Sequence, residues 1–220
     1  MPGITINQRV QKKMEEIPVK PKQIAVIASG RGSNFQAIID AIHTGTVPAT
    51  CATLITDNPN AYAIERAKGA GIPVIVIDYA SFASKKEYEH ALLAAMHRVN
   101  PALFVLAGYM RIVGKEIVDA FSGRMINIHP ALLPAFTGLH AQRQAIQYGV
   151  KVAGCTVHFV DDSLDGGPVI CQRCVPVLDD DDEDALAERI LAHEHQVLPD
   201  AIRLFCEDRL TIDGRKVRIR

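Results

Sequence analysis

The alternation of short apolar runs with helical patterns is the feature that most constrains how this chain of 220 residues can fold. Segments with helical periodicity begin near Asn34, Ala61, Lys85 and Lys115, and β-rich runs lie between them. These runs occupy residues 24–28, 51–55, 74–77, 103–107 and 125–128. Because strand and helix alternate, the sequence predicts an α/β fold with a mostly parallel, twisted sheet covered by helices on both faces.

The pattern changes after His129. A helix near residues 141–148 is followed by two β-rich runs, residues 156–160 and 169–177, with an acidic segment between them. Two neighbouring strands with so short a connection are expected to be antiparallel. The sheet should therefore carry antiparallel strands toward the C-terminus.

The last part of the chain predicts one long helix and a hairpin. The helix covers residues 184–205 and should be interrupted near Pro199, because proline lacks the backbone donor that a helix needs. The Asp213-Gly214 pair within residues 210–217 is a hairpin signal.

Composition narrows the class of protein. We expect one domain over residues 23–220, preceded by an N-terminal extension, residues 1–22. Lys and Arg total 24 against 25 Asp and Glu, so the net charge of -1 creates no field that would hold nucleic acid. The first 22 residues lack the apolar core of a secretory signal, and no run approaches the roughly 20 apolar residues that span a bilayer. A cytoplasmic location is expected.

The five cysteines are expected to be reduced thiols, since their number is odd and a chain of this length does not need disulfides. Cys171 and Cys174 form a CxxC pair, but they lie in a predicted strand, where a spacing of three places them on opposite faces. With no second pair nearby, we do not expect a metal.

The first candidate site is the turn SGRGSN at residues 29–34, where the first strand leads into the first helix. Its glycines let a ligand approach the backbone, and the free N–H groups of a helix start attract an anion. The turn lacks the third glycine of a dinucleotide loop and the GK[ST] ending of a triphosphate loop, so a single phosphate is the better hypothesis. Taken alone, these six residues are equally compatible with an ordinary glycine turn.

Two further candidates follow from strand geometry. Asn127 and His129 share one face of a strand at its carboxyl end, where open α/β sheets bind ligands. The acidic segment, residues 161–168, is by itself best interpreted as a polar loop. A histidine beside one of its carboxylates would change that interpretation, because a carboxylate stabilises and orients an imidazolium.

The fourth candidate is Glu194, which lies between Ile190 and Leu198 on the apolar stripe of the last long helix. A carboxylate buried there would need a cation or hydrogen-bond donors. The alternative is a glutamate at the edge of the stripe that reaches solvent.

At these residues the sequence closely resembles the glycinamide ribonucleotide formyltransferase family, folate-dependent enzymes of purine biosynthesis. The resemblance covers residues 23–212 and rests on motifs in the same order and with similar spacing. These motifs are ASGRGSNFQAI (28–38), LAGYMRI (106–112), NIHPALLP (127–134), GCTVHFV (154–160) and LDGGPVI (164–170). The resemblance implies a Rossmann-like formyltransferase fold.

Matched position by position, the resemblance implies that Gly32, Ser33 and Asn34 hold the phosphate of the ribonucleotide. It implies that Glu194 contacts the glycinamide end of that substrate. The catalytic trio of the family corresponds to three residues of this chain, Asn127, His129 and Asp165.

The resemblance also implies that 10-formyltetrahydrofolate is the co-substrate. The cofactor-binding residues would be Lys85, Met110, Arg111, Ile112, Val113, Asn127, Asp161 and Asp165. Lys85 departs from some relatives, which carry Arg there, and a lysine lacks the planar fork that binds a carboxylate through two donors.

The chemistry that the resemblance implies is attack of the substrate amine on the formyl carbon attached to N10 of the folate. Asn127 and protonated His129 are donors suited to the negative charge that develops on the formyl oxygen. Asp165 would stabilise the imidazolium and help the amine to lose its proton. No metal is needed for these steps.

Three alternatives remain. Formyltetrahydrofolate hydrolase shares the fold but usually carries an N-terminal regulatory domain, for which 22 residues are too few, and the phosphate turn favours a phosphorylated acceptor. Another folate-dependent formyltransferase, acting on methionyl-tRNA, is disfavoured by the neutral charge. A non-catalytic nucleotide-binding module would not need the trio as a set.

The expected partners are therefore glycinamide ribonucleotide and a reduced folate, without nucleic acid or membrane. A homodimer is compatible with the sequence, which does not determine the oligomeric state.

Overall fold

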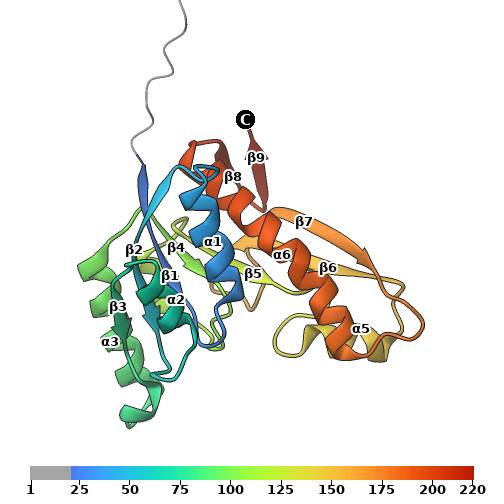
Figure 1. The fold of residues 1–220 in the computed structure, drawn as a ribbon, viewed down its shortest axis with the longest axis horizontal. Helices are drawn as coiled ribbons and strands as arrows, with labels where there is room; N and C mark the ends of the chain where they lie inside the picture. The colour runs from blue at the N-terminus through green and yellow to red at the C-terminus, as the bar shows by residue number, and fades with distance from the viewer. Residues whose placement is uncertain (1–20) are drawn as a thin grey trace, which may run out of the picture.

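The computed structural model describes residues 21–220. The predicted N-terminal extension lies outside the described residues up to residue 20, and the first strand begins at Lys22. Within the described part, nine strands form one continuous sheet in the order β3-β2-β1-β4-β5-β6-β7-β9-β8 (Figure 1).

The N-terminal half has the predicted alternation. It contains β1 (Lys22–Ile27), α1 (Ser33–His43), β2 (Ala49–Thr56), α2 (Ala63–Gly69), β3 (Val74–Val76), the 3₁₀ helix η1 (Tyr79–Ser81), α3 (Lys85–Val99), β4 (Leu103–Leu106), α4 (Lys115–Ala120) and β5 (Met125–His129). Strands β1 to β5 pair in parallel, as the alternation predicts. Their carboxyl ends therefore meet at one edge of the sheet.

The C-terminal half turns antiparallel. It contains α5 (Ala141–Tyr148), β6 (Val152–Phe159), β7 (Val169–Pro176), α6 (Glu183–Cys206), β8 (Leu210–Asp213) and β9 (Lys216–Ile219). Strand β6 pairs antiparallel with both β5 and β7, and β8 and β9 form the predicted hairpin. The predicted fold class is confirmed.

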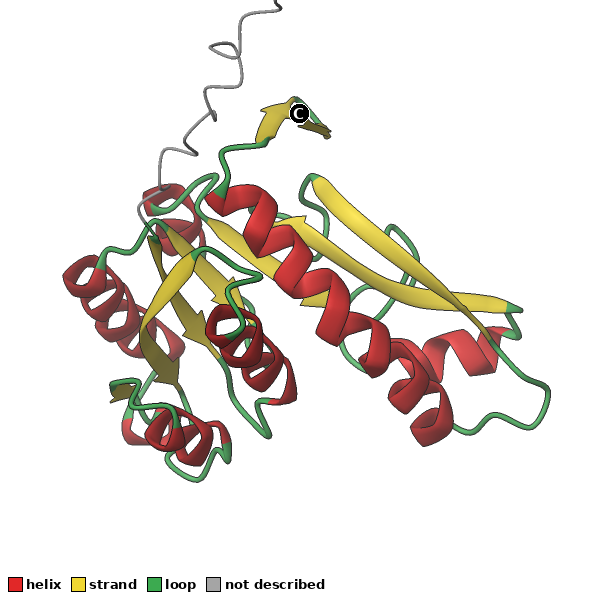
Figure 2. Ribbon diagram, turned by 45° about the horizontal axis from the view of Figure 1, so that its top comes forward, coloured by secondary structure: helices red, strands yellow, loops and turns green. Residues whose placement is uncertain are grey.

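Helices cover both faces of the sheet (Figure 2). The larger core packs α1, α2, α5 and α6 against one face and includes Phe35, Ile38 and Ile190. The smaller core packs α3 and α4 against the other and includes Tyr88 and Leu92. Among the described residues, no helix is long and apolar enough to cross a membrane.

Helix α6 is continuous from Glu183 to Cys206, so the predicted interruption near Pro199 is wrong. A proline inside a helix costs about 3 kcal/mol through its missing donor and its ring. Val197, Leu198 and Ile202 around it are fully buried in the larger core. Burial of each large aliphatic side chain contributes about 1.5–3 kcal/mol, which together outweighs the cost of the proline.

The CxxC pair lies in β7, as predicted. Cys171 is half-buried with its thiol 3.8 Å from the carbonyl oxygen of Val197 on α6, whereas Cys174 is exposed, so the two side chains lie on opposite faces. Within residues 21–220, no group of three or more His, Cys, Asp or Glu side chains is arranged to hold a metal ion.

Candidate active site

The carboxyl edge of the parallel strands gathers the candidate residues at one level of the sheet. Cross-strand pairing aligns Ile27 of β1 with Leu106 of β4, Leu106 with Asn127 of β5, and Asn127 with His158 of β6. The turn after Ile27 and the segment after Leu106 therefore begin beside Asn127. Three of the segments singled out in the sequence are thereby brought to the same edge.

Strand β5 places Asn127 and His129 on the same face. Ile126 and Ile128 point into the larger core, as strand alternation predicts, so the two polar side chains face the other way. His129 is 4% exposed and Asn127 is half-buried. A buried histidine needs partners for both ring nitrogens.

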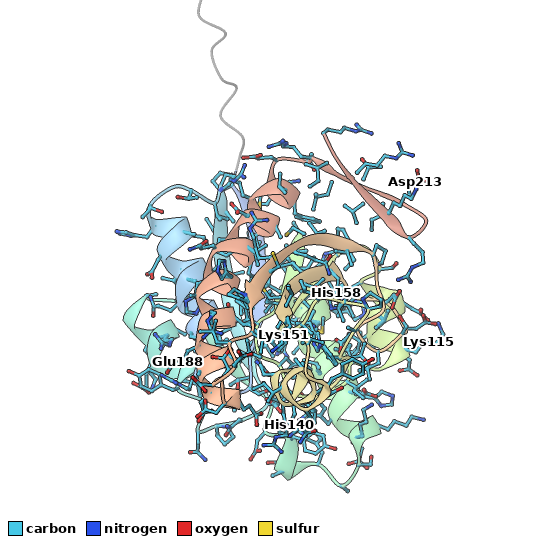
Figure 3. The ribbon with its side chains drawn as sticks, turned by 90° about the vertical axis from the view of Figure 1, so that its right-hand side faces the viewer. Lys115, His140, Lys151, His158, Glu188 and Asp213 are labelled. Atoms are coloured by element: carbon cyan, nitrogen blue, oxygen red, sulfur yellow. The ribbon has the colours of Figure 1, made fainter. Side chains whose placement is uncertain are left out.

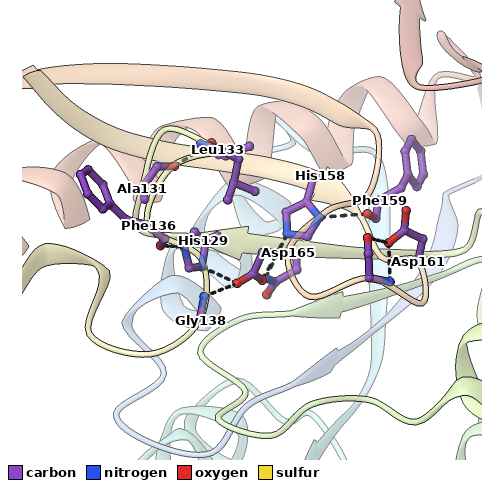
Figure 4. Close-up of polar contacts among 12 residues, drawn as sticks. His129, Ala131, Leu133, Phe136, Gly138, His158, Phe159, Asp161 and Asp165 are labelled. Atoms are coloured by element: carbon purple, nitrogen blue, oxygen red, sulfur yellow. Dashed lines mark hydrogen bonds and ion pairs between the residues drawn. The ribbon is translucent and has the colours of Figure 1, made fainter. Parts of the chain in front are cut away.

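Asp165 provides one of those partners from the loop between β6 and β7 (Figure 4). Its Oδ2 lies 3.4 Å from Nδ1 of His129 and accepts a 2.8 Å hydrogen bond from the backbone N–H of Gly138. The Asp165 backbone has a φ of 50°, a left-handed conformation that aspartate tolerates better than most residues. The polar-loop interpretation of this segment therefore does not describe Asp165, whose carboxylate meets the imidazole.

Both ring nitrogens of His129 lie beside oxygen atoms that can only accept a hydrogen bond. Nε2 lies 2.8 Å from the carbonyl oxygen of Phe136, which can only accept, so Nε2 carries a hydrogen. The carboxylate of Asp165 can also only accept, so its contact with Nδ1 is favourable when Nδ1 carries a hydrogen too. The 3.4 Å separation is longer than a charge-assisted hydrogen bond of about 2.7–2.9 Å, and this leaves the Nδ1–H available to a ligand oxygen.

His158 is a site residue that sequence reasoning missed. It lies on β6 directly opposite Asn127, is 2% exposed, and is labelled in Figures 3 and 4. Nδ1 donates to the carbonyl oxygen of Phe159 at 2.9 Å, and the Nδ2 amide of Asn127 donates to Nε2 at 3.2 Å. The one sequence signal for this role is the strand alternation that puts Thr156 and His158 on one face of β6. That His158 lies opposite Asn127 follows from the register between β5 and β6.

Burial lowers the pKa of the His158 imidazole, which favours its neutral form. In the neutral form with Nδ1 as donor, Nε2 offers a lone pair, so the 3.8 Å approach of Asp165 to Nε2 is not an ion pair in that form. Accepting one amide hydrogen fixes the orientation of the Asn127 side chain and leaves its second N–H for a ligand. Asn127 and His129 thus present one donor each at the same end of β5.

The glycine turn has the geometry of an anion site. Gly32 has a φ of 67° and precedes α1, whose first turn is not capped by a side chain. A Cβ on Gly32 would stand 2.7 Å from Cβ of Ala63, so both the backbone conformation and the packing require glycine. The N–H groups of Ser33, Asn34 and Phe35 at the start of α1 lack intrahelical acceptors, whereas that of Gln36 donates to the carbonyl oxygen of Gly32. The first three can bind an anion.

Asn34 and Glu194 contact each other although they are 160 positions apart. Nδ2 of Asn34 donates to Oε2 of Glu194 at 2.7 Å, and each residue is 7% exposed. The interpretation of Glu194 as a stripe-edge residue that reaches solvent is therefore wrong. Burial raises the pKa of the Glu194 carboxyl group, and the donor from Asn34 partly offsets that effect.

The predicted folate residues divide into two groups. Met110 and Ile112 follow β4 and are each 63% exposed, whereas Val113 packs against the smaller core and Arg111 is turned toward buried groups. The backbone N–H of Met110 donates to Oγ of Ser29 at 3.0 Å, which ties this segment to the glycine turn.

Lys85 and Asp161 are not joined to the trio by any polar contact in residues 21–220. Lys85 begins α3 and pairs with Glu89 at 3.4 Å, with half of its side chain exposed. Oδ1 of Asp161 accepts from the backbone N–H of Ser163 at 2.9 Å and so shapes its own loop.

Comparison with known proteins identifies the family. Residues 22–202 match the family described as formyl transferase. The phosphoribosylglycinamide formyltransferase of Escherichia coli is 42% identical over 187 residues, which cover 85% of this chain and 88% of that protein. The chain belongs to the phosphoribosylglycinamide formyltransferases.

Two other known proteins are similar to this chain. The trifunctional purine biosynthetic protein adenosine-3 of Drosophila melanogaster is 42% identical over 89% of the present chain, which spans only 14% of that protein. The crystal structure of glycinamide ribonucleotide transformylase 1 from Symbiobacterium toebii is 49% identical, with a TM-score of 0.88 over 91% of this chain and 94% of that one. The matched formyltransferase region contains the trio, the glycine turn and Glu194.

Proposed function

We propose that this formyltransferase moves the formyl group of 10-formyltetrahydrofolate to the amine of glycinamide ribonucleotide in de novo purine biosynthesis. The observation that carries the proposal is the assembly of Asn127, His129 and Asp165 at one edge of the sheet. The glycine turn before α1, residues 29–34, lies at the same edge. The names of the similar bacterial enzymes support the same reaction.

The acceptor binds through its two ends. The phosphate sits on the N–H groups at the start of α1, helped by Gly32, Ser33 and Asn34, because a helix N-terminus and a tight glycine turn both favour an anion. Glu194, held by Asn34 at 2.7 Å, orients the glycinamide portion. The amine is thereby carried toward the trio.

The folate binds along the segment after β4. The exposed apolar side chains of Met110 and Ile112 suit a flat ring system, and Arg111 and Val113 hold the segment from the interior. Asn127, Asp161 and Asp165 complete the pocket, and Lys85 at the start of α3 meets the acidic tail. The folate supplies a formyl group bonded to N10, and the reaction that we propose uses no metal.

The transfer forms a bond between the acceptor nitrogen and the formyl carbon and breaks the bond between that carbon and N10. As the amine attacks, negative charge develops on the formyl oxygen, where the free N–H of Asn127 and the Nδ1–H of His129 can stabilise it. Asp165 balances the charge of the imidazolium and takes part in moving the proton lost by the amine, which N10 finally receives. The products are the formylated amine and tetrahydrofolate.

Absorbance of the folate tests the proposed reaction. The purified protein is mixed with 10-formyltetrahydrofolate alone, with glycinamide ribonucleotide, and with methionyl-tRNA. We expect conversion only with glycinamide ribonucleotide. Conversion without any acceptor would make the protein a hydrolase, and absence of conversion under all three conditions would make it a binding module.

The glycine turn is tested by the double variant Ser33→Ala/Asn34→Ala. We expect the acceptor KM to rise about 10- to 100-fold with little change in the donor KM. The variant removes the Ser33 hydroxyl proposed to hold the phosphate and the Asn34 donor that holds Glu194, and each hydrogen bond to a charged group is worth about 1.5–3 kcal/mol. Thr44→Ala/Thr46→Ala at the other end of α1 is the matched control, since these hydroxyls contact each other at 3.0 Å on the surface. An unchanged acceptor KM would remove the turn from the phosphate site.

Glu194→Gln separates binding from stability. We expect the acceptor KM to rise about tenfold, since a hydrogen bond to a charged group is lost. Because burial raises its pKa above the ordinary value of 4.5, the folded protein binds more protons than the unfolded chain. The stability that this group contributes is present below pH 4.5 and lost as pH rises through its folded-state pKa.

The Tm of Glu194→Gln relative to the parent protein should therefore increase from pH 4.5 upward and then level off. Glu188→Gln, at an exposed position of the same helix, is the control and should show no such trend. A Tm difference independent of pH, together with an unchanged acceptor KM, would reduce Glu194 to a structural residue.

Three further proposals concern the domain organisation, the cellular location and the oligomeric state. Residues 23–220 act as one domain, which the continuous sheet supports. A cytoplasmic location agrees with a role in purine biosynthesis. A homodimer stays a prediction that gel filtration would test.

A further inference from the structure

The segment after β4 alternates between inward and outward side chains. Met110 and Ile112 are each 63% exposed, whereas Tyr109 packs against the smaller core and Arg111 keeps only about a third of its side chain exposed. The outward side chains are those that face a ligand in the proposed function. The inward side chains hold the segment to the body of the protein.

Arg111 is held by two groups. Its Nε donates to Oδ2 of Asp57 at 2.5 Å, and its guanidinium carbon lies 3.4 Å from the ring centre of Tyr79. Asp57 directly follows β2, and its side chain is 3% exposed. An ion pair on one side and an aromatic face on the other fix the planar guanidinium in position.

Tyr109 is held from the other side. Its hydroxyl lies 2.7 Å from the hydroxyl of Tyr88 on α3, and the Tyr88 ring packs edge-on against Tyr79, with ring centres 5.0 Å apart. The backbone N–H of Tyr79 donates to the carbonyl oxygen of Asp57 at 3.1 Å. Together with the backbone of residues 109–111, these contacts close a ring through five residues, named here the segment clamp: Asp57, Tyr79, Tyr88, Tyr109 and Arg111.

The buried carboxylate of Asp57 depends on Arg111 for its charge partner and its hydrogen bond. In residues 21–220, Arg111 is the one donor to its carboxylate, and the buried Oδ1 has no hydrogen-bond partner. A buried carboxylate in this state is strongly attracted to the nearest guanidinium. Asp57 therefore pulls Arg111 inward and leaves Met110 and Ile112 facing outward.

We propose that Asp57 is a positioning residue that holds residues 109–112, through Arg111, in the shape that binds the folate. This inference rests on the proposed function for the identity of the ligand. Asp57 acts on donor binding and not on the trio, because within the described part of the chain its side-chain hydrogen bond goes to Arg111 alone.

Steady-state kinetics of Asp57→Asn test the proposal. Asn keeps the size of the side chain and removes the charge, so we expect the donor KM to rise about tenfold, with kcat and the acceptor KM within about twofold of the parent protein. Arg111→Lys should show the same pattern, because lysine keeps the charge but loses the planar stacking. The double variant should be little worse than either single variant, since both changes open the same clamp.

Asp181→Asn is the matched control. Asp181 pairs with Arg189 at 2.6 Å and is 4% exposed, but this pair lies at the start of α6 and outside the site. The Asp181→Asn variant should leave the donor KM unchanged. An unchanged donor KM in Asp57→Asn, or equal losses for donor and acceptor, would overturn the proposal.

Hydrogen–deuterium exchange of the ligand-free protein gives a readout that needs no reaction. Asp57→Asn should speed exchange of the amides of residues 109–112 about tenfold or more, while Asp181→Asn should not. If the parent protein transfers no formyl group but Asp57→Asn still speeds this exchange, the proposed function fails and the clamp stands. If exchange of these amides is unchanged, the clamp itself is refuted.

Discussion

His129→Ala should lower kcat by about 10³-fold or more at neutral pH, because in the proposed mechanism His129 donates to the formyl oxygen and pairs with the Asp165 carboxylate that helps to move the amine proton. Asp165→Asn should also cause a steep loss, since the imidazole of His129 loses the carboxylate that lies 3.4 Å from its Nδ1. In the proposed mechanism the side chains of His129 and Asp165 act as one unit. The double variant should therefore be little worse than His129→Ala alone.

Single-turnover kinetics with both substrates saturating measure these losses at the chemical step. The His90–Glu116 pair is the matched control, since its atoms lie 3.7 Å apart but both side chains are mostly exposed. His90→Ala should leave kcat unchanged. Losses that multiply fully in the double variant of His129 and Asp165 would show that these two residues work independently.

Asn127→Ala should lower kcat by about 10²–10³-fold with smaller changes in either KM, because loss of one donor to a developing oxyanion costs about that much. His158→Phe should cause a smaller loss. The phenylalanine fills the buried space but no longer accepts the 3.2 Å hydrogen bond that orients the Asn127 amide.

The contrast between kcat and KM distinguishes this role from simple substrate binding. Thr156→Val on β6, the strand of His158, is a suitable control. Within the described residues its hydroxyl bonds to the carbonyl oxygen of Ala131, the N–H of Leu133 and the amide of Gln172, and not to Asn127. A variant of Asn127 that raises only the donor KM would make it a binding residue and leave the charge on the formyl oxygen to His129.

The architecture could be predicted because it follows from local periodicity. Alternating β-rich and helical segments specified the parallel half of the sheet, and the short acidic connection specified the antiparallel pair β6 and β7. The continuity of α6 through Pro199 could not be predicted, since it depends on burial on both sides of the proline within a core assembled from distant segments.

The candidate site could be predicted only in part. Strand alternation placed Asn127 and His129 on one face, but the orienting role of His158 depends on the register between β5 and β6. The contact between Asn34 and Glu194 joins α1, the first helix, to α6, the last helix, across 160 positions. No local pattern in the sequence indicates this contact. Pairing across the sheet and between helices is tertiary information.

The fate of a ¹³C label in the formyl group of 10-formyltetrahydrofolate tests the central claim most directly. The protein is mixed with the labelled donor and unlabelled glycinamide ribonucleotide, and the ¹³C signal is followed by NMR. We expect the label to move into an amide formed on the acceptor amine, at a rate that falls steeply in His129→Ala. Label recovered as free formate, or still on the folate while the acceptor stays unmodified, would contradict formyl transfer to this acceptor.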